Sequence, residues 1–417
     1  MLQRGKHLVA ADRGLATGGG IVARLFAGGF HKLIDRIDAG IADGRLDATF
    51  PDGSFRALGG RGEGPAVTLH LKSWRALVRL ATSGSVGWYK AWALDEWASP
   101  DPVALFELFM RNAAGLGDVG RAKGPWKLVN RLAHARRANG KRRARRNIAH
   151  HYDLGNDFYA AWLDPSMTYS SAIFAAGEQS LEAAQRHKVR TLLDRLGLEP
   201  GQHLLEIGCG WGGLAEIAAR DYGVRVTGLT LSSEQKAYAD GRLAGAGLAE
   251  RTTIALTDYR DVTGEFDAVA SVEMVEAVGQ EYWPAYLGSI ARVLKPGGKA
   301  ALQLISIREE LFDRYAANAD FIQTYIFPGG LLIEEDRFRR IGEAAGLAWQ
   351  GRTGHGRDYA ETLARWRARY DEAVAAGRLP DGFDERFHGL WRYYLMYCEG
   401  GFRSGGIDVA QVTLVRS

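Results

Sequence analysis

From about residue 180 onward, the pattern of apolar and polar positions predicts alternating helices and strands. Apolar residues recur at helical spacing over 181–198, and Gly197 is expected to end that helix. The run HLLEIG (203–208) is short and continuously apolar, which is typical of a buried strand. The same reasoning predicts helices over 213–222, 233–247 and 281–298, and strands over 224–231, 252–258, 266–272 and 299–307. Such alternation predicts an α/β fold with a doubly wound, mostly parallel sheet that binds ligand at the carboxyl ends of its strands.

The first 130 residues have a different sequence pattern, in which apolar segments are separated by glycine-rich turns. VTLHLKS (67–73) alternates like a strand, and WRALVRLAT (74–82) reads as the start of a helix. Tryptophans are frequent and are expected either in the core or along a lipid-facing groove: Trp74, Trp88, Trp92, Trp97 and Trp126. A smaller α+β accessory domain over 1–130, a basic linker over 131–149 and a catalytic domain over 150–417 are therefore predicted.

Charge and cysteine content limit the cellular compartment and the binding partners expected for the protein. The chain has 417 residues with a net charge of +4, yet residues 131–146 (RLAHARRANGKRRARR) contain no acid. That segment fits a solvated helix or linker, an anionic membrane surface or nucleic acid, and charge alone does not choose among them. With two cysteines, no 20-residue apolar stretch and no secretory signal, we expect a cytoplasmic protein without a disulfide framework.

The stretch LLEIGCGWGG (204–213) carries the strongest chemical signal. Its glycines satisfy the dinucleotide fingerprint, but a nicotinamide site needs an acid about 20 positions later, where Thr230 stands. An acid instead precedes the glycines at Glu206, and Asp258 follows a later strand, where it suits an adenine amine. The arrangement E-x-G-x-G-x-G resembles motif I of the class I, Rossmann-like S-adenosylmethionine (SAM) methyltransferases, so SAM is favoured over NAD.

The flanking segments strengthen and specify this resemblance. In chain order they are HYDLGNDFYAAWLDPSMTYSSAIF (151–174), LLEIGCGWGGLAEIAA (204–219), VTGLTLSSEQ (226–235), DYRD (258–261), EMVEAVG (273–279), YIFPGG (325–330) and YYLMYCEGGFR (393–403). Together they resemble the cyclopropane-fatty-acyl-phospholipid synthase family over residues 150–417. The N-terminal part resembles, more faintly, the lipid-binding accessory domain of its phospholipid-acting members.

The resemblance implies transfer of the SAM methyl group to the cis double bond of a membrane phospholipid acyl chain, followed by proton loss and closure of a cyclopropane ring. It also implies peripheral association with the inner face of the membrane, and a homodimer. The intermediate carbocation must be kept from water, and aromatic faces suit it. Candidates for that role are Tyr169, Phe174, Tyr325, Phe327 and Tyr359.

In the family, the proton acceptor is associated with a bound bicarbonate. Only some of the residues that hold this bicarbonate have matching residues in this chain. The matching positions are Glu276, Ile305 and Tyr359, whereas Ser171 replaces a cysteine, Gln303 a histidine and Ala277 another histidine. Ser and Gln can still donate hydrogen bonds to an anion. We therefore predict a surviving base site, with Glu276 orienting it or serving as the base. A nucleophilic role for Ser171 finds no support in the motif.

For SAM, the resemblance implies contacts from nine residues: Tyr169, Ser170, Glu206, Gly208, Gly210, Thr230, Gln235, Asp258 and Tyr259. Gln235 as a solvent-facing helix residue and Tyr259 as core packing are the competing interpretations. Neither a metal site nor nucleic-acid binding is predicted, because no N-P-P-Y-like tetrad or nucleic-acid module is present. Two other hypotheses stay open: a SAM-dependent C-methyltransferase that leaves a methyl-branched or methylene-bearing acyl chain, and a non-catalytic binding protein that keeps a SAM fold.

Overall fold

The structure is a computed structural model that describes residues 4–5, 8, 27–117, 154–175, 180–318 and 320–417. The chain divides into two compact units, which are described separately. The first unit comprises Met1–Arg137, Arg308–Pro328 and Asp381–Ile407, and the second comprises Ala138–Ile307, Gly329–Pro380 and Asp408–Ser417. Trp126 and the predicted basic linker lie outside the described residues.

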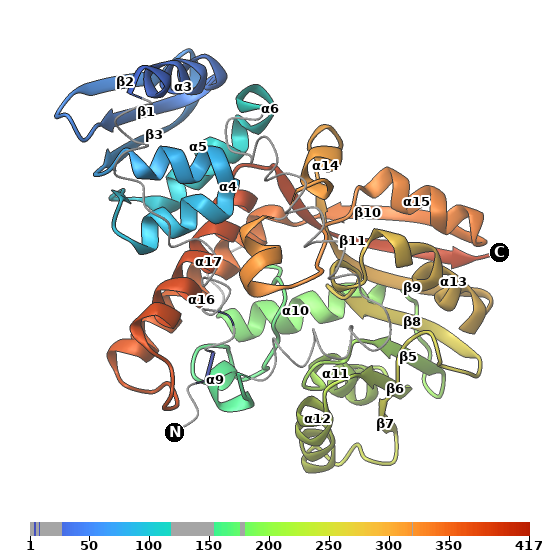
Figure 1. The fold of residues 1–417 in the computed structure, drawn as a ribbon. Coiled ribbons are helices and arrows are strands. Elements are labelled where there is room, and N and C mark those ends of the chain that lie inside the picture. The colour runs from blue at the N-terminus through green and yellow to red at the C-terminus, as the bar shows by residue number, and fades with distance from the viewer. Residues whose placement is uncertain (1–3, 6–7, 9–26, 118–153, 176–179, 319) are drawn as a thin grey trace. The chain divides into compact units, whose positions relative to one another are not determined.

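The second unit is built on a seven-stranded sheet in the order β10-β11-β9-β8-β5-β6-β7 (Figure 1). The strands are β5 (His203–Ile207), β6 (Arg225–Thr230), β7 (Thr252–Leu256), β8 (Phe266–Val272), β9 (Leu294–Ile307), β10 (Leu347–Gly354) and β11 (Ile407–Arg416). The pairs from β9 through β7 are parallel, and β10 pairs with β11 in antiparallel fashion. The α/β class and the mostly parallel sheet predicted from the alternating pattern are confirmed.

Helices follow the strands as predicted, and side-chain caps mark the starts of α10, α12 and α15. The helices are α9 (Asn156–Ala160), α10 (Leu181–Asp194), α11 (Gly213–Asp221), α12 (Ser233–Gly245), α13 (Trp283–Val293), α15 (Glu335–Ala344) and α16 (Gly356–Ala375), with short 3₁₀ turns η2 (Val275–Ala277) and η3 (Gln280–Tyr282). The Ser180 hydroxyl caps α10 by accepting from the Ala183 amide, and Ser232 caps α12 through Gln235. Such caps satisfy backbone donors that the first helical turn leaves open.

The sheet is buried on both faces because successive side chains of a strand point in opposite directions. Leu204, Val226, Ala268 and Ala301 pack with the apolar residues of α10, α11 and α12 in one core cluster. The intervening residue Leu205 is also fully buried, on the opposite face.

The predicted helix over 281–298 was too long at its end. Helix α13 stops at Val293, and Leu294 is already extended, with φ −74° and ψ 140°. Pro296 explains this, because the residue before a proline is driven out of the helical region and proline donates no hydrogen bond. The Pro-Gly-Gly segment therefore belongs to the beginning of β9.

The first unit contains a four-stranded sheet in the order β2-β1-β3-β4. Its elements are α3 (Ala27–Gly40), β1 (Asp43–Thr49), β2 (Phe55–Gly59), β3 (Gly62–Leu71), α4 (Arg75–Ala93), β4 (Trp97–Ala98), α5 (Pro102–Arg111), α6 (Ala113–Leu116), α14 (Glu309–Ala316), the π-helical turn η4 (Ile322–Ile326) and α17 (Glu385–Arg403). The predicted strand at 67–73 and helix from 74 are confirmed within a residue or two at most ends.

Aromatic packing draws two late segments of the chain into the first unit. Trp88 and Trp97 stack with centroids 4.6 Å apart, and both are buried. Tyr89 packs against Phe321, Tyr325 and Tyr393 at 4.9 to 5.0 Å. These contacts are why 308–328 and 381–407 cluster with the N-terminal residues, which differs from the continuous 150–417 domain that the resemblance predicts. No helix in the described part of the chain is long and apolar enough to span a bilayer.

Candidate active site

Polar side chains gather at the carboxyl ends of the parallel strands of the second unit, where α/β folds bind their ligands. Glu206 lies near the end of β5, Thr230 ends β6, and Gln303 lies in the C-terminal half of β9. Glu273 follows the last residue of β8 directly. Three of the predicted site residues, Glu206, Thr230 and Gln303, therefore lie at one edge of the sheet, together with Glu273.

The glycine loop after β5 is shaped by positive φ angles. Gly208 has φ +85° and Gly210 has φ +51°, a region that L-residues with side chains rarely adopt. The amides of Gly208 and Cys209 donate to the Leu229 carbonyl, which closes the loop onto β6. A Cβ at Gly208 would lie 2.9 Å from Met274 Cγ, whereas a Cβ at Gly210 would meet no atom within 4 Å. The loop thus presents bare backbone to open space, as a bound nucleotide requires.

Glu206 is prepared to receive a cationic group. Its side chain is 3% exposed, and burial raises its pKa to about 8. Among the described residues, no donor reaches its Oε2 atom. A buried carboxylate oxygen without a partner is costly unless a ligand supplies one, so the geometry fits the ammonium group of SAM.

Thr230 and Gln235 form a buried hydrogen-bonded pair beside the loop. The Thr230 hydroxyl donates to Gln235 Oε1 at 2.9 Å, and Gln235 is 4% exposed. The solvent-facing interpretation of Gln235 is therefore wrong. Asp258 is held in a two-point ion pair with Arg260, at 2.7 and 2.6 Å. Tyr259 is half-buried and meets the edge of Tyr286, so its core-packing interpretation has a physical basis.

The centre of the presumptive base site is Glu273, which the sequence analysis did not single out. Three donors from different elements converge on its carboxylate. They are the Ser171 amide at 2.8 Å and the Gln303 Nε2 at 2.9 Å, both on Oε1, and the Tyr359 hydroxyl at 2.7 Å on Oε2. The structure thus brings together Ser171, Gln303 and Tyr359, as the resemblance predicts, but around Glu273.

Glu273 also has a strained backbone, with φ +49° at a residue that is not glycine. Such a conformation costs about 1–3 kcal/mol and persists where the surroundings impose it, often at a functional site. The signal available in the sequence was a second acid three residues before Glu276 in EMVEAVG. Nothing in that spacing shows which of the two acids faces the other site residues.

Glu276 occupies a different position from the one expected. Its Oε1 atom accepts a hydrogen bond from the Ile305 amide, and its Oε2 atom has no partner among the described residues. Burial and the neighbouring Glu273 carboxylate raise the pKa of Glu276 to about 8. Burial also raises the pKa of Glu273, but its three donors and Lys188 oppose that rise. Of the two acids, Glu273 is therefore the one better supported as a carboxylate, with Glu276 holding the proton.

These contacts do not fit a bound bicarbonate in this arrangement. The donors from Ser171, Gln303 and Tyr359 are directed to Glu273. A further anion beside the buried Glu273 carboxylate would also be repelled. The Glu273 carboxylate accepts the hydrogen bonds that, according to the resemblance, a bound bicarbonate would accept.

Gln411 is a second residue that the sequence analysis missed. It lies on β11, is fully buried, and donates from Nε2 to Gln303 Oε1 at 3.1 Å. An amide that accepts on its oxygen must present its nitrogen the other way. Gln411 therefore fixes the orientation in which Gln303 donates to Glu273. Its distance in sequence, 108 residues from Gln303, hides the pairing from motif analysis.

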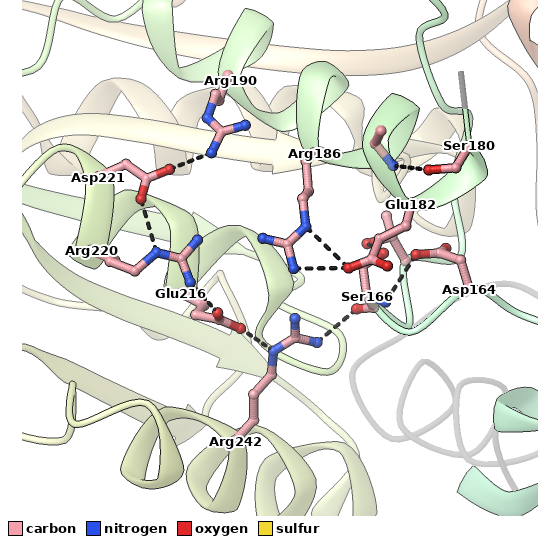
Figure 2. A network of polar contacts seen from close by, with 12 residues as sticks. Asp164, Ser166, Ser180, Glu182, Arg186, Arg190, Glu216, Arg220, Asp221 and Arg242 are labelled. Carbon is pink, nitrogen blue, oxygen red and sulfur yellow. Dashed lines mark hydrogen bonds and ion pairs between the residues drawn. The ribbon is translucent and has the colours of Figure 1, made fainter. Parts of the chain in front are cut away.

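The segment that carries Tyr169, Ser170 and Ser171 is anchored by a polar network, shown in Figure 2. Arg242 donates to the Ser166 carbonyl at 2.7 Å and pairs with Glu216 of α11. Asp164 accepts from the Ser166 amide at 2.9 Å. The network joins this segment to α11 and α12, the two helices that flank β6 and the glycine loop.

The aromatic candidates fall into both units. Tyr169 packs against Tyr159, Trp162 and Trp366 at 5.3 to 5.7 Å. Phe174 lies under the guanidinium group of Arg365 at 4.5 Å. Tyr325 and Phe327 belong to the first unit, where Phe327 meets Tyr394.

Comparison with known proteins decides the family. A family profile described as mycolic acid cyclopropane synthetase matches residues 139–412. The chain belongs to this cyclopropane synthase family. SAM is therefore its methyl donor, and its reaction is a SAM-dependent modification of unsaturated lipid chains.

Individual relatives differ in what they make. The chain is 40% identical over 357 residues to the tuberculostearic acid methyltransferase UfaA1 of Mycobacterium tuberculosis, covering 81% of this chain and 80% of that protein. It is 35% identical over 343 residues to the cyclopropane-fatty-acyl-phospholipid synthase of Escherichia coli, covering 81% and 85%. Among solved structures, mycolic acid cyclopropane synthase CmaA1 complexed with SAH and CTAB matches with a TM-score of 0.61 and 31% identity, over 65% of this chain and 98% of that one.

Proposed function

We propose that this enzyme methylates the cis double bond of an unsaturated phospholipid acyl chain and closes a cyclopropane ring, with Glu273 as the proton acceptor. The main support for this proposal is the Glu273 carboxylate, which is buried and oriented by three hydrogen-bond donors. Its sequence neighbour Met274 lies against the glycine loop, because a Cβ on Gly208 would meet Met274 Cγ at 2.9 Å. The contact of Met274 with Gly208 supports a base close to the proposed cofactor loop.

The proposed chemistry balances at each step. The alkene attacks the methyl group of SAM, the sulfur–methyl bond breaks with its electron pair staying on S-adenosylhomocysteine, and a carbocation is left on the other former alkene carbon. Glu273 then removes a proton from the added methyl group, and the electrons of that C–H bond form the third side of the ring. The Oε2 atom of Glu273 accepts a hydrogen bond from the Tyr359 hydroxyl and retains a lone pair for that proton.

A second candidate is methyl transfer that ends in a methylene or methyl-branched chain. It is favoured by the similarity to a tuberculostearic acid methyltransferase. A hydride shift to the carbocation, followed by loss of a proton from the added methyl group to the same base, would give an exocyclic methylene. Loss of a proton from the acyl chain would instead give a methyl-branched alkene. Both outcomes need a base, so Glu273 serves either.

The test uses SAM with a trideuterated methyl group and vesicles of cis-monounsaturated anionic phospholipid. We expect two deuterium atoms on a ring carbon, located by NMR of the extracted fatty acids. Two deuterium atoms on an exocyclic methylene, or three on a methyl branch, would establish the second candidate instead. Unlabelled lipid, with SAM binding confirmed by titration, would contradict both.

Tyr359→Phe is predicted to shift the pH dependence of turnover. The Tyr359 hydroxyl lowers the pKa of Glu273 by hydrogen bonding to its charged form. Without that donor the pKa of Glu273 rises, so the acidic limb of kcat moves to higher pH and the rate near pH 7 falls about tenfold. The measurement is kcat against pH, and a limb that stays in place contradicts the assignment.

Membrane binding is predicted to depend on the basic segment 131–146. Neutralising its arginines should weaken co-sedimentation with anionic vesicles, because each basic residue near such a surface contributes about 1 kcal/mol. Uncharged phosphatidylcholine vesicles are the control. Equal sedimentation of the variant and the original chain would remove this segment from the proposal.

A further inference from the structure

A buried lysine lies among the acids of the site and has no role in the mechanism described so far. Lys188, on α10, is 0% exposed. Its ammonium group donates to the Ser170 hydroxyl at 2.6 Å. Among the described residues, no other lysine or arginine is completely buried. Such residues are rarely buried unless they are paired.

The surroundings of Lys188 are acidic on several sides. Glu273, Asp164 and Glu206 all act electrostatically on its ammonium group. Glu273 in turn faces Glu276 and Tyr359, and Glu206 faces Cys209. Two fully buried glutamic acids, Glu206 and Glu273, are therefore stabilised in their charged forms by one buried cation, since an isolated buried carboxylate is strongly disfavoured.

The position of Lys188 is held from its backbone as well. Gln411 donates from Nε2 to the Lys188 carbonyl at 3.1 Å, and the same Nε2 contacts Gln303. Gln185, one turn earlier on α10, donates to the Ser170 carbonyl at 2.8 Å. Helix α10 thus reaches both Ser170 and the amide that orients Gln303, so a change at Lys188 bears on both halves of the site.

We propose that Lys188 is a positioning residue that serves two carboxylates at once: its charge favours the ionised form of Glu206 for the cofactor and the ionised form of Glu273 for proton removal. The role at Glu273 rests on the proposed function, whereas the role at Glu206 requires only that the enzyme binds SAM. Lys188 contacts neither the transferred methyl group nor the lipid in this proposal. It acts through the two acids and through Ser170.

Two consequences distinguish this role from mere packing. Removing the positive charge stabilises the protonated form of both acids, so each acid ionises at higher pH. Cofactor binding near neutral pH should then weaken, because a protonated Glu206 no longer attracts an ammonium group. The acidic limb of turnover should move upward, because Glu273 must lose its proton before it can accept one.

The experiment compares Lys188→Met, which keeps the length and apolar stem of the side chain, with the original enzyme. S-adenosylhomocysteine is titrated calorimetrically in buffers of different ionisation enthalpy, which gives both affinity and the number of protons exchanged. We expect affinity near pH 7 to fall about tenfold and proton release on binding to increase. We also expect the acidic limb of kcat to rise by about one pH unit, with activity recovered in alkaline buffer.

Two control variants separate the charge from other effects. Ser170→Ala removes the hydrogen-bond acceptor of Lys188 but keeps the charge, so it should leave the acidic limb of kcat in place; cofactor affinity is not compared for this variant, because Ser170 is itself an expected SAM contact. Lys72→Met makes the same chemical change at an exposed ion pair with Asp95 and should alter neither measurement. Circular dichroism and thermal unfolding confirm that each variant is folded.

Each outcome has a defined meaning. A folded Lys188→Met with unchanged affinity, proton exchange and pH profile overturns the proposal. Ser170→Ala shifting the acidic limb of kcat as Lys188→Met does would also overturn it, because holding Ser170 would then suffice. If the original enzyme labels no lipid but Lys188→Met still changes cofactor affinity and proton exchange, the proposed function fails while the role of Lys188 at Glu206 stands.

Discussion

Glu273→Gln should lower the rate of product formation about 100- to 10,000-fold, the range in which a general base contributes, while SAM affinity changes little. The amide has nearly the shape of the acid but cannot accept the proton that the carbocation must lose. The amide oxygen can take the place of Oε1 and receive the two donors from Ser171 and Gln303, and the amide nitrogen can donate to the Tyr359 hydroxyl, so the local structure is largely kept. Single-turnover kinetics with labelled SAM measures the rate directly.

Glu276→Gln is the matched control, because it makes the same change at the other buried acid of the pair. Glu276 contacts the Ile305 amide and has a pKa of about 8, so we expect it to be protonated and its loss to be milder. The reverse order of effects would restore Glu276 as the base, as the sequence analysis predicts.

A third variant tests whether Glu273 stands in place of a free anion. Glu273→Gly removes the carboxylate and relieves the positive φ of 49°, because glycine adopts that conformation readily. The donors from Ser171, Gln303 and Tyr359 would then surround a space with no carboxylate. Added bicarbonate or formate should partly restore the rate of Glu273→Gly and not that of Glu273→Gln. Failure of rescue in a folded variant would show that those donors alone do not make an anion site.

Gly210→Val should reduce SAM affinity by at least about 100-fold, measured by isothermal titration. A valine is β-branched and disfavours the positive φ of 51° at this position, and its side chain would enter the open space that the loop faces. No protein atom lies within 4 Å of the added Cβ, so the expected loss comes from the ligand side and from backbone strain.

Gly247→Val separates these two contributions. Gly247 also has a positive φ, 71°, and also meets no atom within 4 Å, but it follows α12 away from the glycine loop. It should show a similar cost in thermal stability and unchanged SAM affinity. Equal affinity in Gly210→Val and the original chain would refute the assignment of the loop to the cofactor.

Most helices and strands of the second unit could be predicted from the sequence, because the patterns that indicate them are local. Apolar periodicity located the strands around 203–208 and 266–272, and the run of glycines after Glu206 indicated the nucleotide loop. These features depend on residues that are near one another in the chain, so their physical consequences can be worked out without a fold. The one clear error of extent, at the end of α13, came from underweighting the effect of Pro296 on the residues before it.

Only the tertiary structure decided which acid the donors face. Ser171 lies 102 residues from Glu273, and Tyr359 lies 86 residues from it, so no local spacing could favour Glu273 over Glu276. The same holds for Lys188 and Gln411, whose helical and strand patterns look like ordinary core positions until burial and hydrogen bonding are known. The sequence by itself determined the fold class and indicated the glycine loop and part of the set of polar residues at the candidate site. The protonation and orientation of those residues depend on burial and on partners far apart in the chain, which exist only once the sheet has assembled.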